Sequence, residues 1–170
     1  SMMPFIRQVF VGCGRTGPEN LDRHLFVARK LSENEVRKNG GEGARHFYLP
    51  SCSSSVIVYK GLMRSFRVAR FYPDLEDSLC RSALALVHQR YSTNTFPAWP
   101  LAQPFRFISH NGEINTLRGN MNWMEARQGL FKSELLGAGL ERIFPVLTEG
   151  ANDSAILDNA IELLYHAGRS

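Results

Sequence analysis

The chain has 170 residues, 44% of them hydrophobic and 21% charged, which is the composition of one ordinary globular domain. Its net charge of +4 is modest, and no recognised nucleic-acid-binding module accompanies its one basic cluster, residues 64–70, so no nucleic-acid partner is expected. No apolar run is long enough to cross a bilayer, and no membrane partner is expected either.

The first half of the chain predicts strands around one helix. The apolar residues 6–11 predict a strand, and the glycine-rich residues 12–18 predict a turn. A helix is expected next, with Asn20 as its N-cap, because apolar residues recur at helical spacing at Leu21, Leu25, Ala28 and Leu31. Residues 37–45 predict a polar loop, and residues 46–60 predict a hairpin.

The second half predicts two buried strands and two helices. Residues 71–81 hold a short helix that opens near Pro73. The strands are residues 83–87 and 105–108, and Thr116 caps a helix expected over residues 117–130. The clearest helix covers residues 153–167, ends at Gly168, and has its apolar stripe at Leu157, Ala160, Ile161, Leu164 and Ala167. Because strands and helices do not alternate as βαβ units, the pattern favours an α+β fold.

A glycine motif near the start resembles a dinucleotide-binding fingerprint. Residues 12–17, GCGRTG, match GxGxxG between a predicted strand and a predicted helix. The next predicted strand ends without the carboxylate that would bind a ribose, and Pro18 delays the helix. We therefore interpret the motif as a turn, and we expect no cofactor in this chain. The three cysteines form no CxxC pair, which predicts no metal site and favours a reducing compartment.

Polar clusters follow the two strands of the second half, at residues 90–95 and 110–115. A site for an amino acid needs a guanidinium for the α-carboxylate, a carboxylate for the α-amino group, and donors for a developing oxyanion. Arg90, Asp153 and the pair Asn111–Gly112 offer these groups.

Each of these residues also has a simpler interpretation. Asp153 could cap its helix, and Arg90 could pair with Glu113. Asn111–Gly112 is an ordinary turn dipeptide. His88 and His110 are interpreted as core histidines, because no serine or cysteine is placed for them to activate. Only the joint pattern favours a functional site.

The motifs HxRYSTNTFPxWPLAQPFR and HNGEINTLRGNxNWM resemble the glutaminase domain of the glutamate synthases, a class II, N-terminal nucleophile glutamine amidotransferase. The resemblance extends over most of the chain and includes DSA at residues 153–155. It implies a partial four-layer αββα sandwich of the N-terminal nucleophile hydrolase type. Residues 1–3 are interpreted as a tag remnant, and residues 4–170 as part of the amidotransferase domain.

The resemblance also assigns roles to residues of this sequence. Arg90 would bind the α-carboxylate of L-glutamine, with Thr93 and Asn94 beside it. Asn111 and Gly112 would form the oxyanion hole, and Asp153 would bind the α-amino group. Asn152 stands where the family has a serine.

The family uses an N-terminal cysteine as nucleophile, whereas Cys13, Cys52 and Cys80 are internal. The resemblance therefore implies that this chain alone is inactive. It also implies that the FMN, iron–sulfur and NAD(P)H or ferredoxin sites of a parent glutamate synthase lie in other domains, which become partners of this one. The compartment would be the cytoplasm or a plastid. Two further expectations are self-association through exposed sheet edges and, as the alternative function, a non-catalytic binding or assembly module.

Overall fold

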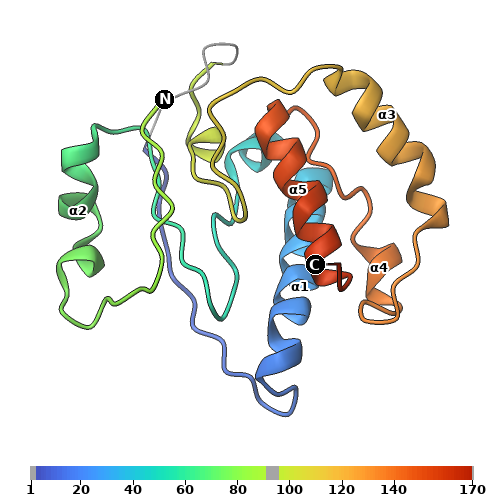
Figure 1. Cartoon of the computed structure of the whole chain (residues 1–170), viewed down its shortest axis with the longest axis horizontal. Coiled ribbons are helices and arrows are strands. Elements are labelled where there is room, and N and C mark those ends of the chain that lie inside the picture. The colour runs from blue at the N-terminus through green and yellow to red at the C-terminus, as the bar shows by residue number, and fades with distance from the viewer. Residues whose placement is uncertain (1–2, 91–95, 170) are drawn as a thin grey trace.

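The computed structural model describes residues 3–90 and 96–169, which form helices joined by extended segments and turns (Figure 1). The α-helices are α1 (Pro18–Asn39), α2 (Val68–Phe71), α3 (Leu117–Arg127), α4 (Gly139–Arg142) and α5 (Asp153–His166). Short 3-10 turns occupy Gly41–His46, Ser65–Arg67, Pro73–Glu76, Trp99–Leu101 and Gln128–Leu130. None of the described helices is long and apolar enough to span a bilayer.

The expected α+β class, a partial four-layer αββα sandwich, is wrong, because residues 3–90 and 96–169 contain no β-strand. Residues 6–11 and 83–87 are not helical, yet no backbone hydrogen bond joins them to another described segment. An isolated extended segment gains no ladder hydrogen bonds and is not a stable strand. The predicted strand at residues 105–108 gives three of its N–H groups to one side chain, that of Asp158.

Helix α1 is longer than its sequence predicts. Pro18 occupies the first turn, where its missing N–H removes no helical hydrogen bond, and Gly17 before it has a φ of 74°. The helix continues through Asn39 into the segment expected to be a loop. Its buried face also differs from the predicted apolar stripe, since it consists of Phe26, Arg29, Lys30 and Glu33.

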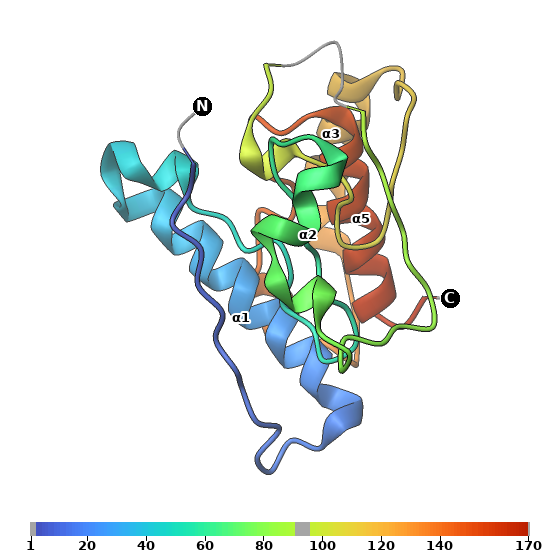
Figure 2. The same ribbon diagram turned by 90° about the vertical axis from the view of Figure 1, so that its left-hand side faces the viewer.

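The hydrophobic core lies where α1, α4 and α5 meet. Its buried members are Phe26, Leu136, Leu140, Ile143, Val146 and Leu163. The Phe26 ring stacks on the His166 ring of α5 at a centroid distance of 4.6 Å, which fixes how α1 and α5 pack. Helix α3 lies at the edge of this group, and α2 lies on the far side of the molecule (Figures 1 and 2).

Helix α5 begins and ends close to its predicted limits. Asn152 Oδ1 accepts a hydrogen bond from Ala155 N at 2.9 Å, which makes Asn152 the N-cap. At the other end, Gly168 has a φ of 87°, a conformation that glycine adopts readily. The helix buries the face that carries Asp158, Asn159 and Glu162, and Leu164 of the predicted apolar stripe is 52% exposed.

Large apolar side chains are exposed along the unpaired segments at residues 5–11 and 84–87. Val9, Phe10 and Leu84 are 83%, 91% and 82% exposed. In Figure 2 the first of these segments runs along the outside of the molecule. Because the described residues form no sheet, these segments cannot associate through sheet edges as expected. Self-association stays a prediction, now through exposed apolar side chains.

Candidate functional site

The Asn111–Gly112 turn follows a segment whose backbone is held by side chains. Asp158 Oδ1 accepts from Phe107 N at 2.8 Å and from Ile108 N at 3.1 Å, and its Oδ2 accepts from Arg106 N at 3.3 Å. Burial raises the pKa of the Asp158 carboxyl, while these backbone donors and the Arg106 guanidinium oppose the rise. One carboxylate of α5 thus fixes the course of the chain as it approaches the turn.

The residue directly before the turn is bound on its backbone and on its ring. Gln103 Nε2 donates to His110 O at 2.7 Å, and His110 N donates to Gln103 Oε1 at 2.7 Å. His110 Nδ1 lies 3.1 Å from Ser154 Oγ, in the first turn of α5. The partly buried ring therefore has a hydrogen-bond partner, but that partner is a serine, so the expectation that no serine lies near His110 is wrong. In the described structure His88 Nδ1 is buried without a hydrogen-bond partner.

Asp153 binds the far side of the same loop. Its Oδ2 accepts a hydrogen bond from Ile114 N at 2.7 Å, and its Oδ1 accepts from Ser154 N at 2.7 Å. The cap of α5 is Asn152, so the N-cap role considered for Asp153 belongs to its neighbour. A carboxylate in the first turn of a helix is stabilised by the helix dipole. The structure thus places Asp153 beside the loop that carries Asn111 and Gly112, both of which are exposed.

The predicted residue Arg90 is not joined to this group. Arg90 is exposed, and among the described residues no hydrogen bond or ion pair links it to Asn111 or Asp153. Thr93 and Asn94 lie outside the described residues. Gln103 and Ser154 contact the loop although the sequence did not single them out as site residues. Gln103 lies inside the quoted LAQPFR motif and Ser154 inside DSA, and these motifs were the available signals for the two residues.

Close packing against the His110 ring makes Gly112 sensitive to substitution. A Cβ at Gly112 would lie 2.9 Å from His110 Nε2 and 3.0 Å from Cε1. We expect Gly112→Ala to displace the ring from Ser154 and to lower the free energy of unfolding by about 1 kcal/mol, the net contribution of one hydrogen bond. Urea unfolding of Gly112→Ala and of a control, Gly129→Ala, measures this. A Cβ at Gly129 meets no atom within 4 Å, and equal effects of the two substitutions would contradict the prediction.

A buried network of charges lies behind the site and joins α1 to α5. Arg29 Nη1 is 2.7 Å from Glu33 Oε2, and Arg29 Nη2 pairs with Glu162. Arg106, which leads toward the turn, lies 3.2 Å from Glu33 Oε1 through Nη2 and 3.8 Å from Glu162 Oε1 through Nε. Burial lowers the pKa of Arg106, and the nearby positive charge of Arg29 lowers it further. The network is structural, because its charged atoms bind one another.

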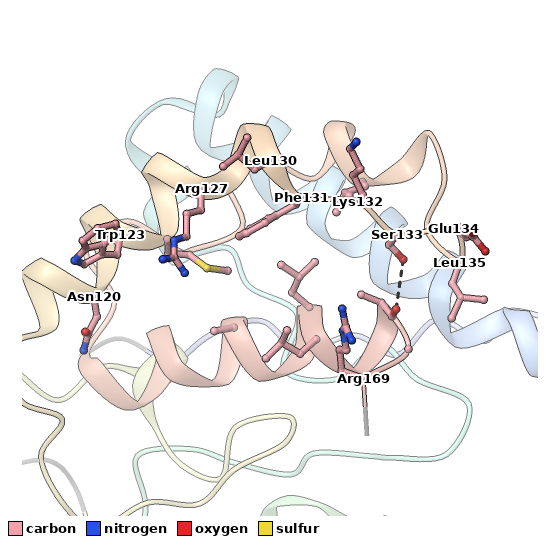
Figure 3. A pocket seen from close by; sticks show the side chains of 17 residues that line it. Asn120, Trp123, Arg127, Leu130, Phe131, Lys132, Ser133, Glu134, Leu135 and Arg169 are labelled. Atoms are coloured by element: carbon pink, nitrogen blue, oxygen red, sulfur yellow. Dashed lines mark hydrogen bonds between the residues drawn. The ribbon is translucent and has the colours of Figure 1, made fainter.

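A cavity of about 1080 Å³ lies elsewhere, between α3 and α5 (Figure 3). Trp123 and Arg127 of α3 stand on one side of it, and Arg169 lies at its end (Figure 3). None of the predicted site residues lines it. Its size alone does not connect it with the chemistry that the loop offers.

The structure supports the interpretation of the GCGRTG motif as a turn. Thr16 N donates to Cys13 O at 3.0 Å, Gly14 and Gly17 have positive φ values, and α1 begins directly after them. In the described part of the chain, no three His, Cys, Asp or Glu side chains gather in a way that could hold a metal ion.

Comparison with known proteins gives the family. Residues 1–170 match the family of class-II glutamine amidotransferases. The chain is 51% identical over 168 residues to the glutamate synthase [NADPH] large chain of Bacillus subtilis (strain 168). It is 46% identical over 167 residues to the ferredoxin-dependent glutamate synthase of Pyropia yezoensis. Both alignments cover 98% of this chain and 11% of the relative, so the chain spans about a tenth of the length of these curated proteins.

The resemblance that the two polar motifs predicted is therefore confirmed over the whole sequence, well beyond the motifs themselves. With the turn, its neighbouring carboxylate and this match together, the chain belongs to the class-II glutamine amidotransferase family.

Proposed function

We propose that this chain forms the glutamine-binding and oxyanion-hole part of the amidotransferase domain of a glutamate synthase. The proposed reaction hydrolyses L-glutamine to glutamate and ammonia, and the ammonia serves glutamate synthesis in other domains. The observation that supports it most is the hydrogen bond of 2.7 Å between Ile114 N and Asp153 Oδ2. This bond holds the Asp153 carboxylate, proposed to bind the substrate amine, in the loop that carries the Asn111–Gly112 turn.

Each proposed role follows from the chemistry of the group. The carboxylate of Asp153 has two oxygens, so it can bind the substrate ammonium while it still accepts from Ile114 N. Arg90 would bind the α-carboxylate of glutamine through two parallel hydrogen bonds, with Thr93 and Asn94 beside it. When the carbonyl is attacked, its oxygen becomes negative. The Asn111 side-chain amide and the Gly112 N–H are the donors proposed to stabilise it.

The nucleophile is proposed to be the N-terminal cysteine that the family uses. Cys13, Cys52 and Cys80 lie inside the chain and have no free α-amine to act as base. Burial raises the pKa of the Cys52 thiol, which disfavours its reactive thiolate. We therefore propose that these 170 residues alone do not hydrolyse glutamine.

The redox cofactors of a glutamate synthase are proposed to bind outside this chain. An iron–sulfur cluster needs several thiolates close together, and the described residues offer no such cluster. FMN and NAD(P)H or ferredoxin are assigned to the same outside regions, which would be this domain's partners. The described cysteines are free thiols, which agrees with a reducing compartment, the cytoplasm or a plastid.

Substitution of Asn111 tests the proposal in the full-length protein. We expect Asn111→Ala to lower kcat for glutamine hydrolysis about 10²-fold and to leave KM nearly unchanged, because the amide acts only on the oxyanion. Asp153→Asn should instead raise KM, since it removes the charge that binds the ammonium. Ammonia release at several glutamine concentrations separates the two effects.

Asn39→Ala serves as the control, because Asn39 is exposed at the end of α1 and bonds only to Glu35 on the same helix. The isolated 170-residue chain is measured as well, and it is expected to release no ammonia from glutamine. Normal kcat in Asn111→Ala, or turnover by the isolated chain, would contradict the proposal. Glutamine binding without turnover in the full-length protein would favour a non-catalytic module instead.

A further inference from the structure

We propose that Gln103 is a positioning residue that fixes the Asn111–Gly112 turn for attack on the glutamine carbonyl. The inference rests on the function proposed above, and it adds a residue to which neither the sequence motifs nor the family match gives a role. It concerns a side chain that does not contact the substrate but determines where the oxyanion donors lie.

The Gln103 carboxamide makes two hydrogen bonds with the backbone of a single residue. Its Nε2 donates to His110 O and its Oε1 accepts from His110 N, both at 2.7 Å. Two strands exchange the same pair of bonds in an antiparallel sheet. A primary amide can replace such a neighbour because it carries one donor group and one acceptor on the same planar unit. In this loop, Gln103 thus takes the place of a paired strand.

The contact is made between two other anchors of the loop. Before it, Asp158 holds the N–H groups of residues 106–108, and after it, Asp153 holds Ile114 N. Between these two anchors, Gln103 binds the His110 backbone, and Ser154 binds only the His110 ring.

Asn111 and Gly112 follow His110 directly, and both are exposed. Gly112 packs against the His110 ring, so the position of His110 sets that of the turn. A displacement of about 1 Å at a catalytic group can cost about 10²-fold in rate. Because the oxyanion forms only in the transition state, such a displacement should lower kcat more than it raises KM.

Gln103→Met in the full-length protein tests the role. Methionine has nearly the same length but makes neither hydrogen bond. We expect kcat for glutamine hydrolysis to fall about 10-fold while KM stays within about twofold. Gln103→Glu keeps the acceptor for His110 N but places a carboxylate against His110 O, so it should not rescue kcat.

Gln128→Met is the matched control. Gln128 Oε1 accepts a hydrogen bond from Val146 N at 3.2 Å, so this variant removes a glutamine contact to backbone away from the turn. Hydrogen exchange provides a second measurement that does not depend on activity. In Gln103→Met the amide of His110 should exchange faster, whereas in Gln128→Met only the amide of Val146 should.

The outcomes separate this inference from the proposed function. If Asn111→Ala is inactive while Gln103→Met keeps a kcat within twofold of wild type, the positioning role is overturned and the proposed function is not. The same holds if Gln103→Met and Gln128→Met lower kcat equally, since the loss would then be general. If Asn111→Ala itself keeps full kcat, the proposed function fails, and the positioning role fails with it.

Discussion

Replacing Glu162 by glutamine is expected to lower the free energy of unfolding by about 3–5 kcal/mol, the usual cost of breaking a buried ion pair from one side. The substitution keeps the size of the side chain and removes its charge. Arg29, which pairs with Glu162, is 2% exposed, so its charge cannot be solvated by water instead. Glu33 would then carry the ion pairs of both Arg29 and Arg106, with Asp158 as a further carboxylate near Arg106.

The electrostatics of Arg29 support this expectation. Burial alone would lower the pKa of its guanidinium, but the carboxylates of Glu162 and Glu33 outweigh burial and raise the pKa. The arginine is therefore held charged by its partners in a site from which water is excluded. Since Arg29 belongs to α1 and Glu162 to α5, loss of the pair should also loosen the packing of these two helices.

A double-mutant cycle separates the pair from its surroundings. Urea unfolding is measured for Glu162→Gln, for Arg29→Met and for both changes together. Because a buried pair can often be replaced by apolar groups at little cost, the double variant should be more stable than the sum of the single losses predicts. Glu125→Gln on the exposed face of α3 is the control, with an expected change within about 0.5 kcal/mol. A loss in Glu162→Gln no larger than in this control would contradict the argument.

The network also explains why the buried faces of the helices could not be predicted. An apolar stripe normally marks the face of a helix that packs on the core. In α1 and α5 the buried faces carry Arg29, Glu33, Asp158 and Glu162, and each of these binds a partner from another part of the chain, although Arg29 Nε itself has no hydrogen-bond partner in the described structure. The periodicity of α5 therefore gave the helix correctly but assigned the wrong face. Partners that are distant in sequence leave no local signal.

Partners distant in sequence also explain why the predicted strands did not form. Apolar runs at residues 6–11, 83–87 and 105–108 have the composition of strands, but a strand also needs a neighbour, which composition does not specify. Three of the four backbone donors at residues 105–108 bind the Asp158 carboxylate, and His110 N, two residues further along, binds Gln103. In this segment, hydrogen bonds to side chains thus take the place of those that a neighbouring strand would supply.

Gly168 ends α5 as predicted, because a glycine acts on its own neighbours, but the N-cap of α5 is Asn152 and not Asp153. The predicted cap Asn20 lies inside α1, which begins at Pro18 after Gly17.

Part of the candidate site could be anticipated from the motifs and part could not. The quoted strings include the turn and Asp153, and the structure holds these close together through Ile114. A motif does not state which side chain positions another, so Gln103 and Ser154 were recognised only from their contacts with His110.

Stability is expected to rise between pH 7 and pH 8.5, by roughly 3 kcal/mol, because two lysines are buried. Lys30 is fully buried and donates to Val146 O. Lys60 is 6% exposed, donates to Pro100 O at 2.8 Å and lies 5.0 Å from the centre of the Phe105 ring. Burial, with the nearby charges of Arg29 and Arg106 respectively, lowers the pKa of each ammonium to about 7.

The sign of the effect follows from the protons bound in each state. An exposed lysine in the unfolded chain has a pKa near 10.5 and stays protonated through this range, whereas the folded chain releases protons above pH 7. The unfolded state therefore binds more protons, and the free energy of unfolding increases with pH. Above pH 9 the rise weakens, because burial raises the pKa of Cys52 above its ordinary 9.0 and that of Tyr48 to about 12, so the folded state keeps protons there that the unfolded state loses.

Urea unfolding at pH 7.0 and 8.5, at constant ionic strength, measures this rise. Lys30→Met and Lys60→Met should each remove about half of it, and the double variant should remove nearly all of it. Lys38→Met is the control, because Lys38 is exposed in the last turn of the same helix as Lys30 and should leave the rise unchanged. If the double variant kept the wild-type dependence on pH, the folded chain would have to hold both lysines charged. Water would then have to reach the two ammonium groups, since a buried ammonium with a single carbonyl acceptor would otherwise lose its proton.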